Sequence, residues 1–349
     1  RDWFMVRTDF NGVVQWTQRR GGAGNEALRF LRQFPNGDFL QAGFVSAVGA
    51  GSIEGCLSRI DPMGNLVWMK AYGDTAEDWP RDVIFAANGD IVVAGVREDY
   101  LAAPTAFLMR TDSAGNVLWT RDINGSGTEF GQGVIEMPNG DLVMVGATNT
   151  AGAGQFDVLL IRTDAQGNLI WSKSFGGAQE DFGWSIALAA DGNILISGWT
   201  RSIGVGDQDI FISKVDPFGN LLWTNTYGGP AVEGEFLTHE KSLIATPDGG
   251  GVRLASTASF GPGNLDLLLL KVDSMGLAEC EVATNGFQPD TVILASTLIP
   301  QVETVINPGL GTDTAISTPV TFADSNFCDG PVVPPIVCTA DASFSSLIG

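Results

Sequence analysis

The chain alternates short apolar runs with polar turn residues, which predicts β-strands. The clearest stretch predicts four strands, at about 132–138, 141–148, 157–163 and 167–174. In other third strands the apolar residues are consecutive, as in the pairs Phe107-Leu108 and Phe211-Ile212. Both faces of these sheets must therefore be covered, and face-to-face packing of neighbouring sheets would cover them.

One motif recurs every 51 or 52 residues and follows the third strand of each unit. It consists of an aspartate, a glycine three positions later and a tryptophan four positions after that. The aspartates are Asp9, Asp61, Asp112, Asp164 and Asp216, and the tryptophans are Trp16, Trp68, Trp119, Trp171 and Trp223. A degenerate sixth copy begins at Asp273 and has Cys280 in place of the tryptophan. Such periods indicate supersecondary units that bury their apolar faces against one another.

Glycines mark two further places in each unit. Asn-Gly or Asp-Gly pairs join the first two strands, and we expect two-residue hairpin loops with positive φ at these glycines. They are Gly37, Gly89, Gly140, Gly192 and Gly249. A second glycine six residues later predicts close backbone approach; this position holds Gly43, Gly95, Gly146 and Gly198, and Ala255 in the last unit.

Four-stranded units of about 50 residues with a periodic aromatic predict an all-β fold, the β-propeller, and a solenoid is the weaker alternative. The chain enters at a third strand near residues 3–8, so the first unit lacks two strands. We expect strands from the C-terminal extension to complete it, which gives six blades. Seven blades is the alternative if upstream repeats are missing.

Composition and charge narrow the function classes. The chain has 349 residues, of which 44% are hydrophobic and 17% are charged, as in ordinary globular proteins. Its net charge of −21 opposes contact with a phosphate backbone, so we expect no nucleic-acid partner. No apolar run approaches the roughly 18 residues of a membrane-spanning helix.

The C-terminal part differs in composition, since no basic residue follows Lys271. We divide the chain into a propeller at 1–280, an acidic Thr-rich β extension at 281–330, a Pro-rich linker at 331–337 and a final segment at 338–349. Strand-like runs in the extension lie at 290–296, 301–307 and 315–323.

Three of the four cysteines belong to this acidic part, which suits an oxidising, extracellular setting. We expect a disulfide between Cys280 and Cys328. Cys56 occupies a position that is Phe or Leu in the other units, so we expect a buried thiol there.

Charged positions also repeat. A basic residue stands two positions before each motif aspartate, at Arg7, Arg59, Arg110, Arg162, Lys214 and Lys271. A glutamate follows each tryptophan by nine or ten residues, at Glu26, Glu77, Glu129, Glu180 and Glu233. Because these residues occur in every unit, we interpret them as ion pairs or turn clamps rather than as a polyvalent ionic site.

The segment Asp216-Pro-Phe-Gly-Asn-Leu-Leu-Trp223 resembles the tryptophan-docking repeat of quinoprotein-like propellers. Residues 1–280, with segments such as 176–184, are similar to repeat propellers of very large bacterial surface proteins that use type IX secretion. In that family an acidic segment bounded by cysteines leads into immunoglobulin-like domains of the polycystic-kidney-disease type. Residues 338–344 resemble the first strand of such a domain. The resemblance implies an extracellular location at the bacterial cell surface and a longer polypeptide.

Catalytic chemistry finds little support among the residues. The only histidine, His239, lies in an insertion at about 234–241 that we interpret as a surface loop rather than as part of a Ser-His-Asp site. A sialidase needs a Tyr nucleophile with an arginine cluster, and Tyr72 and Tyr227 fall at packing positions of the repeat, which leaves Tyr100. The adjacent-cysteine disulfide of quinone-dependent dehydrogenases has no counterpart here. We predict that the protein is not an enzyme.

Cofactor signals are weak as well. Zinc needs more His and Cys ligands than the chain offers, whereas structural calcium has candidate ligands in loop carboxylates. These are Asp74, Glu77, Asp78, Asp207 and Asp209. The GxG pairs such as Gly152/Gly154 and Gly204/Gly206 join strands, so we interpret them as loop glycines and expect no nucleotide or other organic cofactor.

Two irregular loops are candidate contact surfaces, because recognition on repeat scaffolds uses irregular loops. One is Arg97–Pro104, with Glu98, Asp99 and Tyr100, and the other is the insertion with Phe236 and His239. Tolerated surface variation is the alternative for both.

We expect a non-enzymatic, extracellular module of a large bacterial surface protein that serves interaction, adhesion or structure. One possibility within this expectation is that the module is part of an oligomeric appendage. Its expected partners are other domains of the same polypeptide, other surface proteins, glycans or identical subunits, with no direct membrane span. The alternative is a secreted carbohydrate-active propeller, either a hydrolase or lectin-like.

Overall fold

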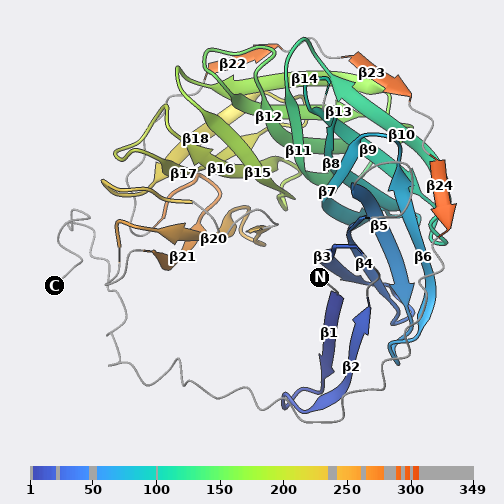
Figure 1. The fold of residues 1–349 in the computed structure, drawn as a ribbon. Coiled ribbons are helices and arrows are strands. Elements are labelled where there is room, and N and C mark those ends of the chain that lie inside the picture. The colour runs from blue at the N-terminus through green and yellow to red at the C-terminus, as the bar shows by residue number, and fades with distance from the viewer. Residues whose placement is uncertain are drawn as a thin grey trace.

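The computed structural model describes residues 3–20, 24–46, 53–99, 101–234, 242–260 and 265–278, and the backbone of 288–291, 295–298 and 302–305. The regular elements of this part are β-strands (Figure 1). The first ten are β1 (Trp3–Thr8), β2 (Val14–Arg20), β3 (Glu26–Gln33), β4 (Phe39–Ser46), β5 (Ile53–Ile60), β6 (Leu66–Gly73), β7 (Glu77–Phe85), β8 (Ile91–Glu98), β9 (Thr105–Thr111) and β10 (Val117–Asn124). The next eight are β11 (Glu129–Glu136), β12 (Leu142–Thr148), β13 (Asp157–Thr163), β14 (Leu169–Gly176), β15 (Asp181–Leu188), β16 (Ile194–Thr200), β17 (Asp209–Val215) and β18 (Leu221–Tyr227). The last six are β19 (Leu243–Ala245), β20 (Gly251–Thr257), β21 (Asp266–Val272), β22 (Gln288–Thr291), β23 (Ala295–Leu298) and β24 (Val302–Val305).

Consecutive strands form antiparallel sheets that follow one another along an arc (Figure 1). We name the four-stranded units blade I (β3–β6), blade II (β7–β10), blade III (β11–β14) and blade IV (β15–β18). Within each blade the first strand lies on the inside of the arc and the fourth on the outside. The two-stranded unit β1–β2 precedes blade I, and the three-stranded unit β19–β21 follows blade IV. The all-β propeller predicted from the sequence, with four-stranded blades and a short β-rich C-terminal extension, is confirmed.

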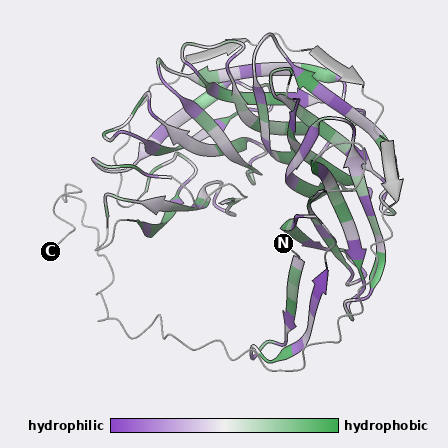
Figure 2. Cartoon of the chain, in the orientation of Figure 1, coloured by the Kyte–Doolittle hydropathy of each residue, from purple (hydrophilic) through white to green (hydrophobic). Residues whose placement is uncertain are grey.

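The hydrophobic core lies between blades. One cluster joins Val92 and Leu108 of blade II with Met144 of blade III, and the next joins Val145 of blade III with Ile194 of blade IV. These five side chains are at most 1% exposed, and burying each one contributes about 1.5–3 kcal/mol relative to exposure. Figure 2 shows hydrophobic residues on strands throughout the arc. Both faces of a blade are thus covered, as the consecutive apolar residues predict.

The hairpin loops are one residue longer than predicted. Gly37 N donates to Phe34 O at 2.9 Å, and Phe34 N donates to Asp38 O at 2.8 Å. This pattern encloses three residues, a type I turn followed by a left-handed glycine, rather than the expected two-residue loop. The predicted positive φ is confirmed at Gly37, where it is 91°. One left-handed residue is enough to match the twist of the strands, so the preceding asparagine needs no positive φ.

The second glycine of each unit meets the backbone as closely as the sequence predicts. A Cβ on Gly146 would lie 1.6 Å from Phe130 O, and a Cβ on Gly95 would lie 2.3 Å from Trp79 O. In both cases the carbonyl belongs to the innermost strand, near a β-bulge in that strand. The glycine therefore makes room for the bulge.

The C-terminal extension lies on the outside of the arc. Its strands pair antiparallel with the fourth strands of three blades: β22 with β14, β23 with β10 and β24 with β6. We call these three strands the outer belt. We expected strands of the extension to complete the first unit. For β22, β23 and β24 this expectation is wrong, because among the described strands β1 and β2 pair only with each other. The outer edge of a blade offers a row of unpaired backbone groups, which a short strand can satisfy.

The two ends of the arc expose apolar residues. On β21, Leu267 and Leu269 are 68% and 70% exposed, and on β1 Phe4 is 58% exposed. In complete blades the corresponding face packs against a neighbouring blade. The exposure therefore reflects position at the end of the described arc and not a different strand pattern.

Candidate functional site

The motif aspartates close the turn between the third and fourth strands. Asp61 Oδ1 accepts hydrogen bonds from the N–H groups of Met63 (2.9 Å) and Asn65 (2.8 Å), and Oδ2 accepts one from the Asn65 side chain at 2.8 Å. These bonds, the Asn65 side chain first, lower the pKa of Asp61. The same bonds recur at Asp112, Asp164 and Asp216. Each motif aspartate therefore stabilises the turn between the third and fourth strands.

The motif tryptophans pack against the turn of the next unit. A Cβ on Gly115 would lie 2.9 Å from the Trp68 ring, and a Cβ on Gly167 would lie 2.8 Å from the Trp119 ring. The indole N–H of Trp16 also donates to Pro62 O at 3.2 Å. The tryptophan of one unit thus sits on the motif glycine of the following unit and fixes the two blades together.

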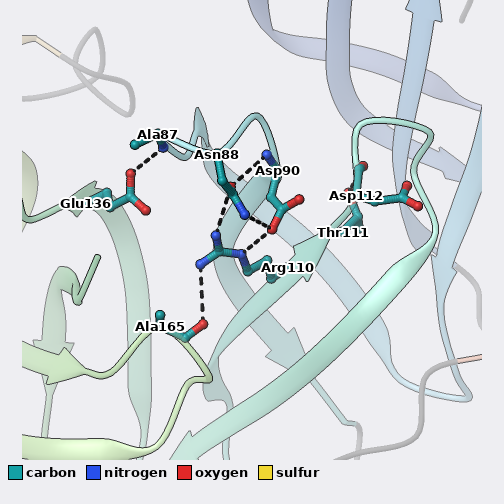
Figure 3. Close-up of polar contacts among 8 residues, drawn as sticks. All are labelled: Ala87, Asn88, Asp90, Arg110, Thr111, Asp112, Glu136 and Ala165. Carbon is teal, nitrogen blue, oxygen red and sulfur yellow. Dashed lines mark hydrogen bonds and ion pairs between the residues drawn. The ribbon is translucent and has the colours of Figure 1, made fainter. Parts of the chain in front are cut away.

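The basic residue before each motif aspartate completes this contact. Arg110 Nε donates to Asp90 Oδ2 at 2.8 Å within its own blade, and Nη1 donates to Ala165 O in the next blade at 3.3 Å (Figure 3). Arg7, Arg59, Arg162 and Lys214 reach the corresponding carbonyls of Pro62, Ser113, Pro217 and Ser274. The same figure shows Glu136 accepting a hydrogen bond from Ala87 N, a further bond between blades II and III.

Replacing Arg110 with Met should lower the free energy of unfolding by about 2–4 kcal/mol, because it leaves the Asp90 carboxylate without its buried partner. Lys271→Met is the matched control. Lys271 pairs with Asp248 at 2.7 Å, but the side chains are 46% and 53% exposed, so its loss should cost much less than the loss of Arg110. Urea unfolding measures both variants, and equal losses would contradict a role of the buried pair in holding blades together.

The repeated acidic position needs a correction. Spacing from the tryptophan predicts that Glu77 and Glu180 are equivalent to Glu129, but in the structure Asp78 and Asp181 occupy that position instead. Glu129 pairs with Thr148 on the second strand, as Asp181 does with Thr200. Glu180 lies one residue earlier and pairs with Arg201 at 2.6 Å. Two adjacent acidic residues in these units hid the alignment, and a slip of one residue moves a side chain to the other face of a strand.

Three buried carboxylates at this position, in blade II, in blade IV and in the unit after blade IV, each have a second carboxylate nearby. A glycine at or just after the end of the preceding fourth strand lies between the two. A Cβ on Gly176 would lie 1.8 Å from Asp157 Oδ1 and 2.8 Å from Asp181 Oδ2. Gly73 meets Glu54 and Asp78 in the same way, and Gly228 meets Asp209 and Glu233. Only glycine fits this crossover, so the carboxylates shape the chain path between blades.

Burial raises the pKa of several of these carboxyl groups. It raises the pKa of Asp78 to about 7, with Arg97 opposing the rise and with Asp74 and Glu54 adding to it. Burial likewise raises the pKa of Asp181, Asp209 and Glu233. Asp78 is 2% exposed, and a backbone hydrogen bond from Asp74 only partly opposes the effect of burial.

The first predicted contact loop begins with a residue of the scaffold. Arg97 forms ion pairs with Asp74 and, at 2.8 Å, with Asp122. Glu98 ends β8 and is half-buried, whereas Asp99 is exposed and accepts a hydrogen bond from Leu101 N at 3.0 Å. Tyr100, Phe236 and His239 lie outside the described residues, as do Cys280 and Cys328. The contact loops stay a prediction.

Other single residues lie where the sequence predicts. Tyr72 and Tyr227 are 2% and 3% exposed, and their hydroxyls donate to Gly115 O and Gly276 O. Cys56 is a buried free thiol, and burial raises its pKa. These residues have packing roles.

The candidate calcium ligands do not converge in the described part of the chain. No group of three or more His, Cys, Asp or Glu side chains there has an arrangement that would hold a metal ion. Asp209 Oδ2 instead accepts hydrogen bonds from Val205 N and Gly206 N, at 2.8 and 3.1 Å. The GxG glycines lie in loops between second and third strands, as predicted. Within the described ranges no helix is long and apolar enough to cross a membrane.

Sequence reasoning missed a set of residues at equivalent bulges on the innermost strands. In each blade one residue of the first strand has no Cα partner on the second strand. These residues are Arg29, Arg81, Gln132 and Trp184. Bulges redirect side chains and are common beside functional sites. The position is constant in structure but varies in chemistry from blade to blade.

Aromatic rings lie beside three of these bulge residues, Arg29, Arg81 and Trp184. The Arg29 guanidinium lies 5.7 Å from the Phe44 ring centroid and 5.6 Å from that of Trp79, and Arg81 lies 5.9 Å from Trp79. We call the four bulge residues, with Phe44, Trp79, Phe182 and Trp199, the bulge surface. In blade IV, Phe182 stacks on Trp199 at 4.7 Å and contacts Trp184 at 6.2 Å. All of these residues except Gln132 are half-buried.

The bulge surface also has polar groups without partners. Burial lowers the pKa of Arg81 to about 10, and the nearby Arg29 adds to this effect while Glu98 opposes it. Arg81 Nε and Gln132 Oε1 are buried, and neither has a hydrogen-bond partner among the described residues. Two neighbouring arginines are notable in a chain of net charge −21. Arginine and aromatic side chains are enriched at binding hot spots, so this surface suits contact with a partner.

A sequence signal for this surface exists. The bulge residues stand three positions after the buried carboxylates Glu26, Asp78, Glu129 and Asp181. With Glu77 and Glu180 taken as the equivalent residues, this constant offset of three positions is lost.

No protein-family model matches this chain. A stretch of 89 residues is 28% identical to Regulatory protein FlaEY of Caulobacter vibrioides, which covers 22% of this chain and 9% of that protein. The chain thus spans less than a tenth of the length of this curated relative.

Proposed function

We propose that this chain is a non-enzymatic, extracellular interaction and adhesion module of a large bacterial cell-surface protein. The observation that carries the proposal is the bulge surface, where a repeated backbone feature places Arg29, Arg81 and Trp184 beside aromatic rings. Residues that serve the scaffold recur from blade to blade, as Arg110 and its counterparts do. Residues at one structural position that differ between blades are free to serve recognition.

The finer assignment follows from the resemblance described above. The protein would leave the cell by type IX secretion, and residues 338–349 would begin an immunoglobulin-like domain of the polycystic-kidney-disease type. Its partners would be other domains of the same polypeptide, other surface proteins, glycans or identical subunits. The denatured mass of the polypeptide in the producing bacterium tests this: a mass several times 36.8 kDa supports it, and a mass near 36.8 kDa contradicts it.

The double variant Arg81→Gln/Trp184→Ala should reduce binding of the labelled protein to intact cells of the producing bacterium at least tenfold. Truncation of central arginine and aromatic contacts commonly costs 2 kcal/mol or more, which corresponds to a factor of about 30. Flow cytometry over a concentration series measures the apparent affinity, and circular dichroism verifies that the variant is folded.

The matched control is Lys271→Gln, which removes a positive charge from an exposed side chain outside the bulge surface. It should bind like the wild type. Equal binding by the folded double variant would place the contact elsewhere on the molecule.

A lectin-like function is the second candidate, favoured by the half-buried ring pair Phe182–Trp199 with Arg201 lying 5.3 Å from the Trp199 centroid. A polysaccharide that raises the thermal midpoint of the wild type but not of Trp184→Ala would support it.

A further inference from the structure

The interface between blade IV and the unit β19–β21 is polar at a place where the preceding interfaces are apolar. Between blades III and IV, Val145 and Ile196 lie in one hydrophobic cluster, each on the second strand of its blade. Between blades II and III the residues at the same two strand positions are Ala94 and Met144. Ser197 and Arg253 occupy these positions at the last interface, where Arg253 Nη1 donates to Ser197 Oγ at 2.9 Å. Both sides of this one interface are therefore polar.

Arg253 brings a positive charge into this interface. It is 0% exposed, and Nη1 donates a further hydrogen bond to the hydroxyl of Ser242. Nε and Nη2 are buried, and neither has a hydrogen-bond partner among the described residues. Burial lowers the pKa of the guanidinium to about 10, which still leaves it charged at neutral pH. A buried charge held only by neutral hydroxyls is costly, because it needs an opposite charge close to it.

A comparison with blade II shows where such an opposite charge fits. Asp82 Oδ2 accepts a hydrogen bond at 2.9 Å from a backbone N–H on the first strand of blade III. At the same strand position blade IV has Ser185, whose hydroxyl accepts the equivalent bond from Leu243 N at 3.2 Å. In the sheets Ser185 pairs with Ser197 and Leu243 pairs with Arg253, and paired residues share one face. Blade IV therefore places a hydroxyl beside Arg253 where blade II has a carboxylate.

We propose that this interface binds a small monovalent anion, chloride, between Arg253 and the hydroxyls of Ser185, Ser197 and Ser242. Arg253 Nε and Nη2 are the charged donors, and a hydroxyl that accepts one hydrogen bond keeps its own proton to donate. One guanidinium charge calls for one negative charge, which favours a monovalent ion. Ser185 and Ser197 are 0% exposed, which favours a small one, whereas Ser242 is half-buried and marks the side nearer to solvent. The site is separate from the bulge surface and does not depend on the proposed function.

The thermal midpoint of the full chain tests the proposal in sodium chloride and in sodium gluconate at equal ionic strength. An anion that binds only the folded state raises the midpoint, and gluconate is too large for a buried site. We expect the wild type to melt about 3 °C or more higher in chloride than in gluconate. Crystals soaked in bromide should show anomalous scattering in contact with Arg253 Nε or Nη2.

Two variants separate anion binding from a general effect of salt. Arg253→Met should lose the chloride-specific rise, and Met144 shows that methionine fits this strand position. In gluconate this variant should melt at or above the wild type, because it removes an uncompensated buried charge. Ser185→Asp supplies a fixed carboxylate, as Asp82 does in blade II, and should also lose most of the rise.

Three results would overturn the proposal. One is a wild type that melts at the same temperature in both salts, and another is an Arg253→Met variant that keeps the full chloride-specific rise. The third is a wild type without a chloride effect whose midpoint falls on Glu235→Gln or Glu240→Gln, which would assign the opposite charge to the chain itself. Bromide scattering at Arg253 together with loss of the rise in Arg253→Met would support it.

Discussion

Replacing Asp78 with Asn will stabilise the protein at pH 8.5 by about 2–4 kcal/mol and remove much of its loss of stability as the pH rises from 5 to 7. Burial raises the pKa of Asp78 to about 7 in the folded state, against about 3.9 in an unfolded chain. The folded state therefore binds this proton more tightly than the unfolded state. Its contribution is fully present below about pH 4 and is lost as the pH rises through 7.

The size of the effect follows from the shift. A difference of about three pKa units corresponds to roughly 4 kcal/mol between the two ends of the titration. The asparagine amide retains the volume of the side chain but has no charge to bury, although its own polar atoms keep part of the desolvation cost, which lowers the expected gain. Asp181, Asp209 and Glu233 have raised pKa values as well and will leave a smaller slope of the same sign.

Urea unfolding from pH 5 to 8.5 measures this prediction. The lowered pKa values of the motif aspartates, such as Asp61, affect stability only below about pH 4, so they do not contribute in this window. Asp99→Asn removes the same charge from an exposed position and is the matched control. If Asp78→Asn keeps the full slope of the wild type, the buried carboxylate is not its source.

Gly115→Ala will destabilise the protein by about 3–4 kcal/mol. Gly115 has φ of 77°, and alanine at such a left-handed position costs about 1 kcal/mol. The added Cβ would also lie 2.8 Å from Tyr72 Oη and 2.9 Å from the Trp68 ring. Overpacking of this kind adds about 1–3 kcal/mol. The substitution separates blade II from the aromatic side chains that blade I places on it.

Gly89→Ala separates the two causes. Gly89 has φ of 89°, and nothing lies within 4 Å of its added Cβ. It should cost about 1 kcal/mol, the backbone effect alone. Urea unfolding followed by tryptophan fluorescence compares the variants. Equal losses would show that the contact with Trp68 contributes nothing to the joining of blades.

The residues of the scaffold are easier to predict from the sequence than the residues of the bulge surface. Trp68, Gly115 and Asp61 stand at fixed spacing, and each acts through contacts within one period of the repeat, so periodicity alone reveals them. Arg29, Arg81, Gln132 and Trp184 share a position but no residue type. They become a set only when strand pairing shows that all four occupy the same bulge.

The sequence by itself determined the all-β repeat, the four strands of a blade, the left-handed glycines and the burial of Cys56, Tyr72 and Tyr227. These features depend on local propensity and on a period that every unit repeats. The tertiary structure decided that the hairpin loops hold three residues, that Asp78 and Asp181 occupy the buried acidic position, and that the extension pairs with β6, β10 and β14. Each of these depends on the pairing of one backbone with another, which side-chain pattern alone does not specify.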